Sequence, residues 1–289
     1  MSASNYSIWV LEYAISEEYP VSGVLYGEHN QGFIHLPYAY VVMKSADRVV
    51  MVDVGYKYEK YGKTLADRFS VINWRDPRTV LGEVGIAPTD VTDVIVTHAH
   101  FDHFGNIEDF PRATFHIQEE EFAKWAWALT LPSEFAWLQK ALNPDDIVTA
   151  ARLAAEGRLK FVQGDRAEIL PGIDVWAAHD SHTFGSQFVV VNNDGGSDPW
   201  VLAGDLRYVF ENVTGIDNSG NYVPVGLASG SQLNLLRATD HMMNLVARDH
   251  MRIVPVHEDR LSTVFPSRVS GEGLRIVEIT LAKSDSTRV

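Results

Sequence analysis

Three histidines and one aspartate fall within six residues of the chain, directly after a β-branched run at 91–96 that predicts a buried strand. They are His98, His100, Asp102 and His103. In an extended segment the first two side chains point the same way, and a turn at Phe101 can bring the other two round to face them. Imidazole and carboxylate, without thiolate, suit zinc, iron or manganese. The pattern therefore predicts a metal site; the alternative is a polar loop whose histidines cap the next helix.

Further candidate ligands follow apolar runs later in the chain. His182 lies in the polar turn 180–186, Asp205 comes after the run 201–204, and His257 comes after the run 253–256. A carboxylate or imidazole at the end of a buried strand lies at the rim of a sheet, where functional sites gather. Each of the three, taken alone, is as easily an ordinary turn residue. Together with the four residues at 98–103, which form the metal loop, they would supply the side chains that a second metal needs.

The order of these residues resembles the metallo-β-lactamase superfamily over roughly residues 37–258, and Asp53, shortly before Gly55, resembles the early structural aspartate of that superfamily. The resemblance implies an α/β fold, an αββα sandwich with two metals between the sheet edges. It also implies a ligand set. One metal would be held by His98, His100 and His182, the other by Asp102, His103 and His257, with Asp205 bridging them.

A narrower resemblance concerns Tyr208, which follows Asp205 by three residues. In the N-acyl-homoserine lactonase branch, a tyrosine at this position reaches the substrate carbonyl. Two residues depart from that branch, because Ser181 stands where a glycine is usual and Phe184 replaces a common proline. The substrate can therefore differ while metal binding is kept. A tyrosine that only packs is the alternative.

The resemblance implies a dinuclear zinc-dependent hydrolase that opens a small cyclic ester, a lactone. Two divalent ions can supply hydroxide at neutral pH and polarise the carbonyl under attack. Asp102 would orient the water or take its proton, and Tyr208 would donate to the developing oxyanion. Iron or manganese could replace zinc. The alternatives are a cyclic amide or β-lactam hydrolase, an iron-bearing redox enzyme of the same fold, a nuclease, or a non-catalytic binding protein.

The composition limits the kinds of partner that the protein is expected to bind. The 289 residues are 46% apolar and carry a formal charge of −14, which disfavours nucleic acid and anionic membranes and favours a small-molecule substrate. No cysteine is present, so neither disulfides nor thiolate ligands are expected. The first residues lack the pattern of a signal peptide, and no apolar run is long enough to span a membrane, so a cytoplasmic protein is expected. The oligomeric state stays open, with a homodimer as one possibility.

The elements that must position these residues are predicted from periodicity and from turn residues. Strands are expected at 8–13, 38–43, 49–54, 91–96, 114–118, 159–162, 173–178, 187–191, 199–203 and 251–256, and helices at 58–69, 78–84 and 231–249. Residues 1–289 contain no linker or repeat, which predicts one domain of two packed sheets flanked by helices.

A helical insertion is expected at about 119–158, broken at Pro132 and Pro144. Its aromatic residues are expected either to pack beneath the insertion or to line a pocket. They are Trp125, Trp127, Phe135 and Trp137. The polar stretch 16–32 is interpreted as a surface loop or as a flap over the pocket. Contacts that support the ligands from outside are an alternative for His179, Glu258 and Asp259, whereas His116 is noted only as an extra histidine at a strand end.

Overall fold

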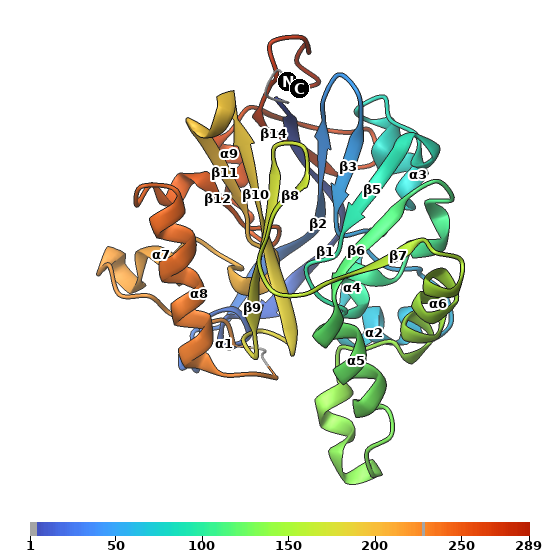
Figure 1. Cartoon of the computed structure of the whole chain (residues 1–289). Helices are drawn as coiled ribbons and strands as arrows, with labels where there is room; N and C mark the ends of the chain where they lie inside the picture. Colours follow the sequence, from blue (N-terminus) through green and yellow to red (C-terminus); the bar gives the residue numbers. More distant parts are fainter. Residues whose placement is uncertain (1–4, 227–228) are drawn as a thin grey trace.

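The computed structural model describes residues 5–226 and 229–289. Within these residues, two mixed sheets of nine and five strands face each other at the centre of the molecule (Figure 1). The larger sheet has the order β13 (Ser267–Val269), β14 (Arg275–Thr280), β1 (Ser7–Pro20), β2 (Phe33–Lys44), β3 (Val49–Val52), β5 (Val91–Ile95), β6 (Thr114–Gln118) and β7 (Leu159–Val162), and β4 (Val71–Ile72) pairs with β1. The smaller sheet has the order β12 (Ile253–Val254), β11 (Asp198–Leu202), β10 (Gly185–Asn193), β9 (Ile173–His179) and β8 (Arg166–Leu170).

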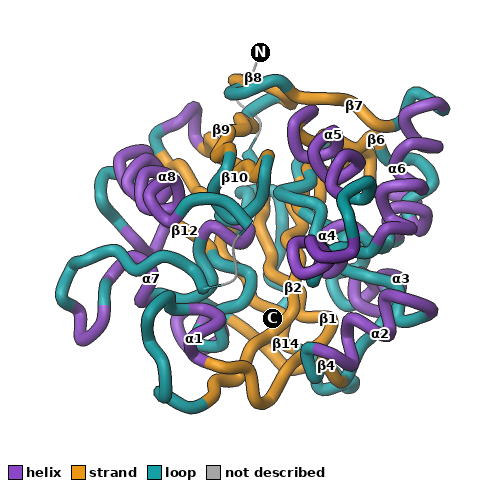
Figure 2. Tube along the Cα trace, turned by 90° about the horizontal axis from the view of Figure 1, so that it is seen from below, coloured by secondary structure: helices purple, strands orange, loops and turns teal. Residues whose placement is uncertain are grey.

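Helices cover the outer faces of both sheets, which confirms the predicted αββα layering (Figure 1). On the side of the larger sheet lie α2 (Lys60–Arg68), α3 (Pro77–Gly82), α4 (Phe101–Phe104), α5 (Glu119–Ala128) and α6 (Pro144–Ala155). On the other side lie α7 (Glu211–Thr214) and α8 (Gln232–Leu245), while α1 (Val21–Val24) and α9 (Leu261–Val264) are single turns. The view from below shows α4 on the same side as α5 and α6, with α7 and α8 on the opposite side (Figure 2).

The core has two parts because the central strands are buried on both faces. Along β1, Ile8 and Val10 pack between the sheets, whereas Trp9 and Leu11 pack on the helix side. This alternation follows from the two-residue period of a strand. With both faces covered by apolar contacts, the sheets form a rigid frame for the loops at their ends.

Several predicted boundaries are wrong. The strand expected at 8–13 continues to Pro20, and the strand expected at 38–43 begins at Phe33. These extensions pair with each other, with Tyr19 opposite Ile34, so residues 16–20 form a strand and not the predicted loop. The strand expected at 251–256 is only Ile253–Val254. Four strands, β4, β8, β13 and β14, were not predicted, because their alternation is short and weak.

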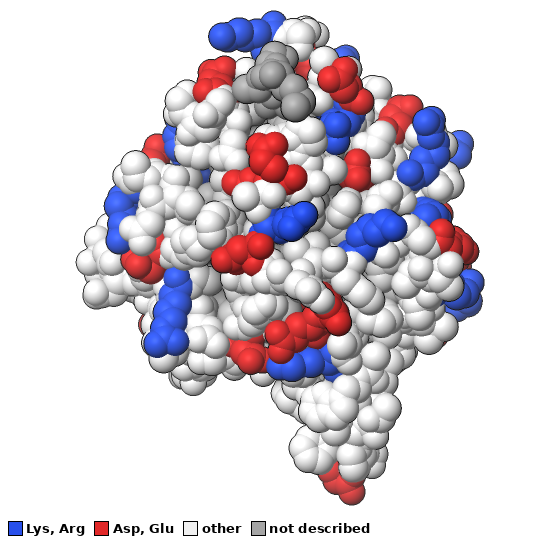
Figure 3. All heavy atoms as spheres, in the orientation of Figure 1, with Lys and Arg blue, Asp and Glu red and all other residues white. Residues whose placement is uncertain are grey.

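The helical segment 119–158 is the crossover between the parallel strands β6 and β7, a connection that parallel pairing requires. Both α5 and α6 pack on the sheets, and only the part around the 3₁₀ segment Ser133–Gln139 projects from the body (Figure 1). On the face shown in Figure 3, this projection carries little charge except near its tip. The predicted breaks at Pro132 and Pro144 are confirmed.

No helix among the described residues is both long and apolar enough to cross a membrane. That residues 1–289 form one domain stays a prediction.

Candidate metal centre

All seven predicted ligands lie where strands of the two sheets end. The loop after β5 and the helix α4 carry four of them, the turn between β9 and β10 carries His182, and the segments after β11 and β12 carry Asp205 and His257. Each strand is held by apolar packing, so its end delivers the following side chain to a defined place. The helix α4 marks this end of the sheets in Figure 2.

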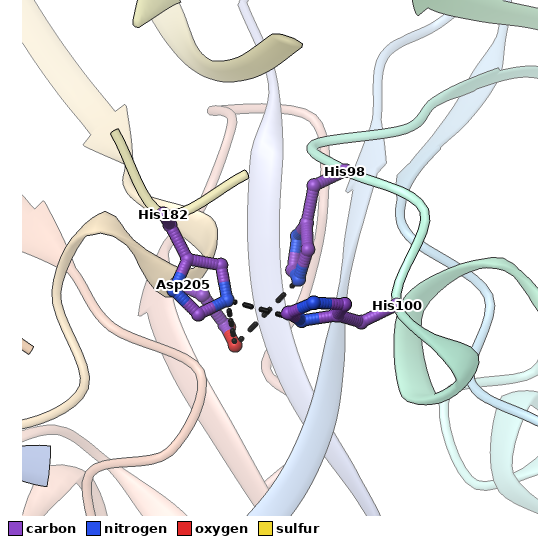
Figure 4. A group of neighbouring side chains, drawn as sticks. All are labelled: His98, His100, His182 and Asp205. Atoms are coloured by element: carbon purple, nitrogen blue, oxygen red, sulfur yellow. Dashed lines mark hydrogen bonds and ion pairs between the residues drawn. The ribbon is translucent and has the colours of Figure 1, made fainter. Parts of the chain in front are cut away.

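The ligands form two buried groups. The first consists of His98, His100, His182 and Asp205, and the second of Asp102, His103 and His257. Within each group, every residue offers a nitrogen or oxygen atom, and these atoms lie within 4.8 Å of one another. Figure 4 shows the first group, in which the three imidazoles and the carboxylate converge from separate segments of the chain.

Asp205 lies between the two groups. Its Oδ2 atom lies 3.4 Å from Nε2 of His182 and 3.7 Å from Nε2 of His98. Its Oδ1 atom lies 3.1 Å from Nε2 of His103 and 3.2 Å from Nε2 of His257. One carboxylate thus presents a separate oxygen to each histidine group, which is the arrangement that a bridging ligand needs.

The tautomers of the histidines are set by contacts on their far side. Nδ1 of His257 lies 2.7 Å from the carbonyl oxygen of Pro37, which can only accept, so Nδ1 carries the hydrogen. The hydroxyl of Thr97 donates to Asp53 and therefore accepts from Nδ1 of His98, 3.0 Å away. Nε2 of each of these two rings then faces Asp205. Such outer contacts are how proteins orient histidine ligands for a metal.

Asp53 supports the second group directly. Its Oδ2 atom lies 2.8 Å from Nδ1 of His103, and its Oδ1 atom accepts the backbone N–H of Thr97 at 2.7 Å. Asp53 adopts a positive φ of 64°, a conformation that costs energy outside glycine and that clusters at functional sites. The early aspartate named in the sequence analysis therefore fixes both the loop and one of its histidines.

Buried polar atoms without a hydrogen-bond partner indicate whether a metal ion fits this site. Among the described residues, Nε2 of His98, His103 and His257 and Oδ1 of Asp205 are enclosed without a hydrogen-bond partner. Leaving such atoms bare is costly, and a cation would satisfy all four. Burial also lowers the pKa of His100 to about 3, and that of His182 to about 4, so both rings are neutral and can act as ligands. The donor set fits two divalent ions.

His103 differs from the other histidines in its charge. Burial favours its neutral form, but the carboxylates of Asp205, Asp102 and Asp53 together hold its pKa well above the usual 6.5. Although burial opposes ionisation of Asp205, the neighbouring His103 and His257 keep the pKa of that carboxyl well below 3.8. When no metal is bound, His103 therefore carries a proton between the ionised carboxylates of Asp102 and Asp205.

Tyr208 lies beside this centre. It is 3% exposed, and its ring stacks on that of His257. Asn212 fixes the backbone here, because its Oδ1 atom accepts the N–H groups of Tyr208 and Val209, each at 2.9 Å. Burial, with the negative charge of Asp205, keeps the pKa of Tyr208 well above 10, so the phenol stays a hydrogen-bond donor.

The residues suggested as outer support have different partners, and so does the extra histidine His116. His116 forms an ion pair with Asp93, and His179 forms one with Glu120. Glu258 accepts hydrogen bonds from Arg260 and from the backbone N–H of Phe210. Asp259 pairs with His35 and Arg275. No hydrogen bond joins any of the four to the seven ligands within the described residues. The suggested supporting role is wrong.

Sequence reasoning missed Glu121, which is enclosed between the metal loop and the turn that carries His182. Glu121, Trp125 and Ala128 share the buried face of α5, at the i, i+4, i+7 spacing of an apolar stripe. An acid on such a stripe is unusual, and this was the signal that could have identified it.

Two cavities adjoin the centre. A small one of about 20 Å³ lies between the ligands and Tyr208, and a larger cleft of about 820 Å³ opens outside it. Tyr19 and Phe69 line both cavities, so they separate them. Trp137 lines the outer cleft, as one alternative for the insertion predicted, and Ser22 and Gly23 from the possible flap line it too. Phe33, at the start of β2, completes its aromatic wall. Trp125 is buried instead, and Trp127 and Phe135 lie outside the lining, so their predicted pocket role is wrong.

Comparison with known proteins places these features in context. A family model described as the metallo-beta-lactamase superfamily matches residues 35–255. An N-acyl homoserine lactone hydrolase, with the product N-hexanoyl-L-homoserine at its catalytic metal centre, is 17% identical over 91% of this chain and 97% of that chain, with a TM-score of 0.65. A probable metal-dependent hydrolase from Staphylococcus aureus is 17% identical over 90% of this chain and 91% of that chain, also with a TM-score of 0.65.

AidC, a dizinc quorum-quenching lactonase in complex with a product, is 14% identical over 99% of this chain and 100% of that chain, with a TM-score of 0.59. At these identities the likeness to solved structures shows the fold.

Proposed function

Because the chain belongs to the metallo-beta-lactamase superfamily and is a metal-dependent hydrolase of that fold, we propose that it is a dinuclear zinc enzyme that opens a small lactone. The observation that carries this proposal is the place of Asp205, whose two oxygens face different histidine groups. One carboxylate in that position joins two metal sites into one reaction centre.

The proposed ligands are those of the two buried groups. His98, His100 and His182 would hold one ion, Asp102, His103 and His257 the other, and Asp205 both. Bound there, two divalent ions would supply a Lewis acid for the ester carbonyl and would lower the pKa of a water so that it attacks at neutral pH.

Asp102 and Tyr208 are the proposed catalytic residues. Both line the small cavity, so a carbonyl group placed there would touch both side chains. Asp102 is ionised, because the charge of His103 outweighs the effect of burial on its pKa, and it can accept the proton of the attacking water. As the water oxygen bonds to the carbonyl carbon, charge develops on the carbonyl oxygen, and the phenol of Tyr208 donates to it. The ring C–O bond then breaks, and the leaving oxygen takes up a proton.

The cavities bear on the size of the substrate. The inner cavity of about 20 Å³ is too small for a lactone ring, so the ring enters only when Tyr19 or Phe69 moves. The outer cleft of about 820 Å³ has room for a substituent on the ring. Its aromatic wall, with Phe33 and Trp137, favours an apolar substituent. Lactone hydrolases among the structural neighbours support the same choice of substrate.

The test is a hydrolysis screen with purified protein whose metal content has been measured. Lactones of several ring sizes and substituent lengths are compared with cyclic amides and β-lactams. We expect about two zinc ions per chain and the highest kcat/KM on a substituted lactone. Iron in place of zinc would favour the alternative of a redox enzyme. A preference for cyclic amides would show that the substrate is a cyclic amide and not a lactone.

A further inference from the structure

An enclosed carboxylate joins the two loops that carry the first histidine group. Glu121 lies in the first turn of α5 and is 0% exposed. Its Oε1 atom accepts the backbone N–H of Ala99 at 2.8 Å, and its Oε2 atom accepts the backbone N–H of Gly185 at 2.6 Å. Ala99 lies between His98 and His100, and Gly185 lies three residues after His182. A single side chain thus ties the loop after β5 to the turn before β10.

Two side chains complete the environment of Glu121. The indole Nε1 of Trp125 donates to Oε1 at 2.7 Å, and the hydroxyl of Thr183 donates to Oε2 at 2.8 Å. Three of the four partners of Glu121 are N–H groups, which can only donate. Each oxygen of Glu121 faces at least one of them, so both must accept. An amide in this place would turn its NH₂ group toward a donor and leave buried hydrogen bonds unmade.

Close packing makes this connection rigid. A Cβ atom on Gly185 would lie 2.4 Å from the backbone nitrogen of Glu121, so the turn and α5 are in direct contact. The ring of Trp125 packs against His100 and Phe184, with centroids 5.9 and 4.8 Å away. A shift of Glu121 would therefore be transmitted to both loops rather than absorbed.

We infer that Glu121 is a positioning residue for one half of the metal centre. It sets the distance between the loop of His98 and His100 and the turn of His182 without itself reaching the ion. No hydrogen bond joins Glu121 to any of these three imidazoles in the part of the chain that the structure describes. The Asp102, His103 and His257 group has its own supports in Asp53 and Pro37 and does not depend on Glu121. The inference rests on the proposed two-metal centre, but not on its substrate.

The experiment titrates zinc into metal-free full-length protein in the presence of a competing chelator. Glu121→Gln is compared with Glu119→Gln, which makes the same change in the same turn of α5 at an exposed position. Outer contacts of metal ligands typically contribute about 10–100-fold to affinity. We expect Glu121→Gln to weaken one of the two zinc sites by about that factor and to leave the other unchanged. The absorption spectrum with cobalt in place of zinc should change at one site only.

Thr183→Val removes one donor to Glu121 while keeping the shape of the side chain, and it serves if Glu121→Gln does not fold. A smaller loss at the same zinc site is expected. Wild-type affinity at both sites in the folded variants would overturn the inference, as would equal weakening of both sites. If the wild type binds two zinc ions but opens no lactone, the proposed substrate fails while this inference stands.

Discussion

The ring of Tyr208 stacks on the ring of His257, with centroids 4.8 Å apart and planes inclined by 24°. Since His257 belongs to the second ligand group, this contact holds the phenol over the small cavity. The contact uses the faces of the rings and does not involve the hydroxyl. A change to phenylalanine would therefore keep the stack and remove only the donor.

Tyr208→Phe is expected to lower kcat by about 10²–10³ on the best lactone, because a donor to the developing oxyanion is lost. KM, the melting temperature and the metal content should change little. Steady-state kinetics and metal analysis check this outcome. Activity within about twofold of the wild type would make Tyr208 a packing residue.

Asp205→Asn is expected to lower the metal content from two ions toward one. The neutral amide offers one weak oxygen ligand in place of two charged ones, so activity should fall by more than the roughly 10–100-fold typical of an outer contact. Asp198→Asn, at the other end of β11, is the control and should keep both ions. Two tightly bound ions in Asp205→Asn would contradict the bridging role.

Metal binding is expected to release about one proton at pH 7.5. His103 has a pKa well above 6.5 in the metal-free protein, whereas His100 and His182 are already neutral. A metal on Nε2 of His103 must displace its proton, so affinity should fall about tenfold for each unit that pH drops, while His103 remains protonated. Calorimetry in two buffers of different ionisation enthalpy counts the protons. Binding without proton release would show that His103 is not a ligand.

Trp137→Ala is expected to raise KM several-fold for lactones with a long apolar substituent and to leave unsubstituted lactones unaffected. Trp137 is 74% exposed at the outer cleft, so its loss should cost little stability. Trp127→Ala is the matched control, because this residue is also exposed but lies outside the cleft. Equal KM values for all three proteins would remove Trp137 from substrate binding.

Trp125→Ala is expected to act on stability instead. The ring is fully buried against His100 and Phe184, and its indole donates to Glu121. Truncation of such a core aromatic typically costs about 3–5 kcal/mol of unfolding free energy. Denaturant unfolding monitored by circular dichroism measures the change. A loss below about 1 kcal/mol would show that the surrounding core closes around the cavity.

The metal loop could be predicted because its four proposed ligands fall within six residues, so the local sequence alone brings them close together. His182, Asp205 and His257 could be predicted because each follows an apolar run, and a polar residue at the end of a buried strand lies at the rim of a sheet. Glu121 could not, since its partners Ala99 and Gly185 are 22 and 64 residues away and give no local pattern. The strands β13 and β14 were missed for a similar reason, because β14 is placed in the sheet by pairing with β1, far away in the sequence, and β13 is placed by pairing with β14.

The position of β1 between β2 and β14 also bears on synthesis of the protein. Ile8 pairs with Thr280 and Leu11 with Ile276, so β1 is synthesised long before its partner strand β14. While the ribosome is still translating, the edge of β1 that will face β14 is open and can pair with a neighbouring nascent chain. We expect polypeptides stalled before residue 275 to depend on chaperones and to be cut readily by protease. That edge becomes shielded only when β14 has been synthesised and has paired with β1.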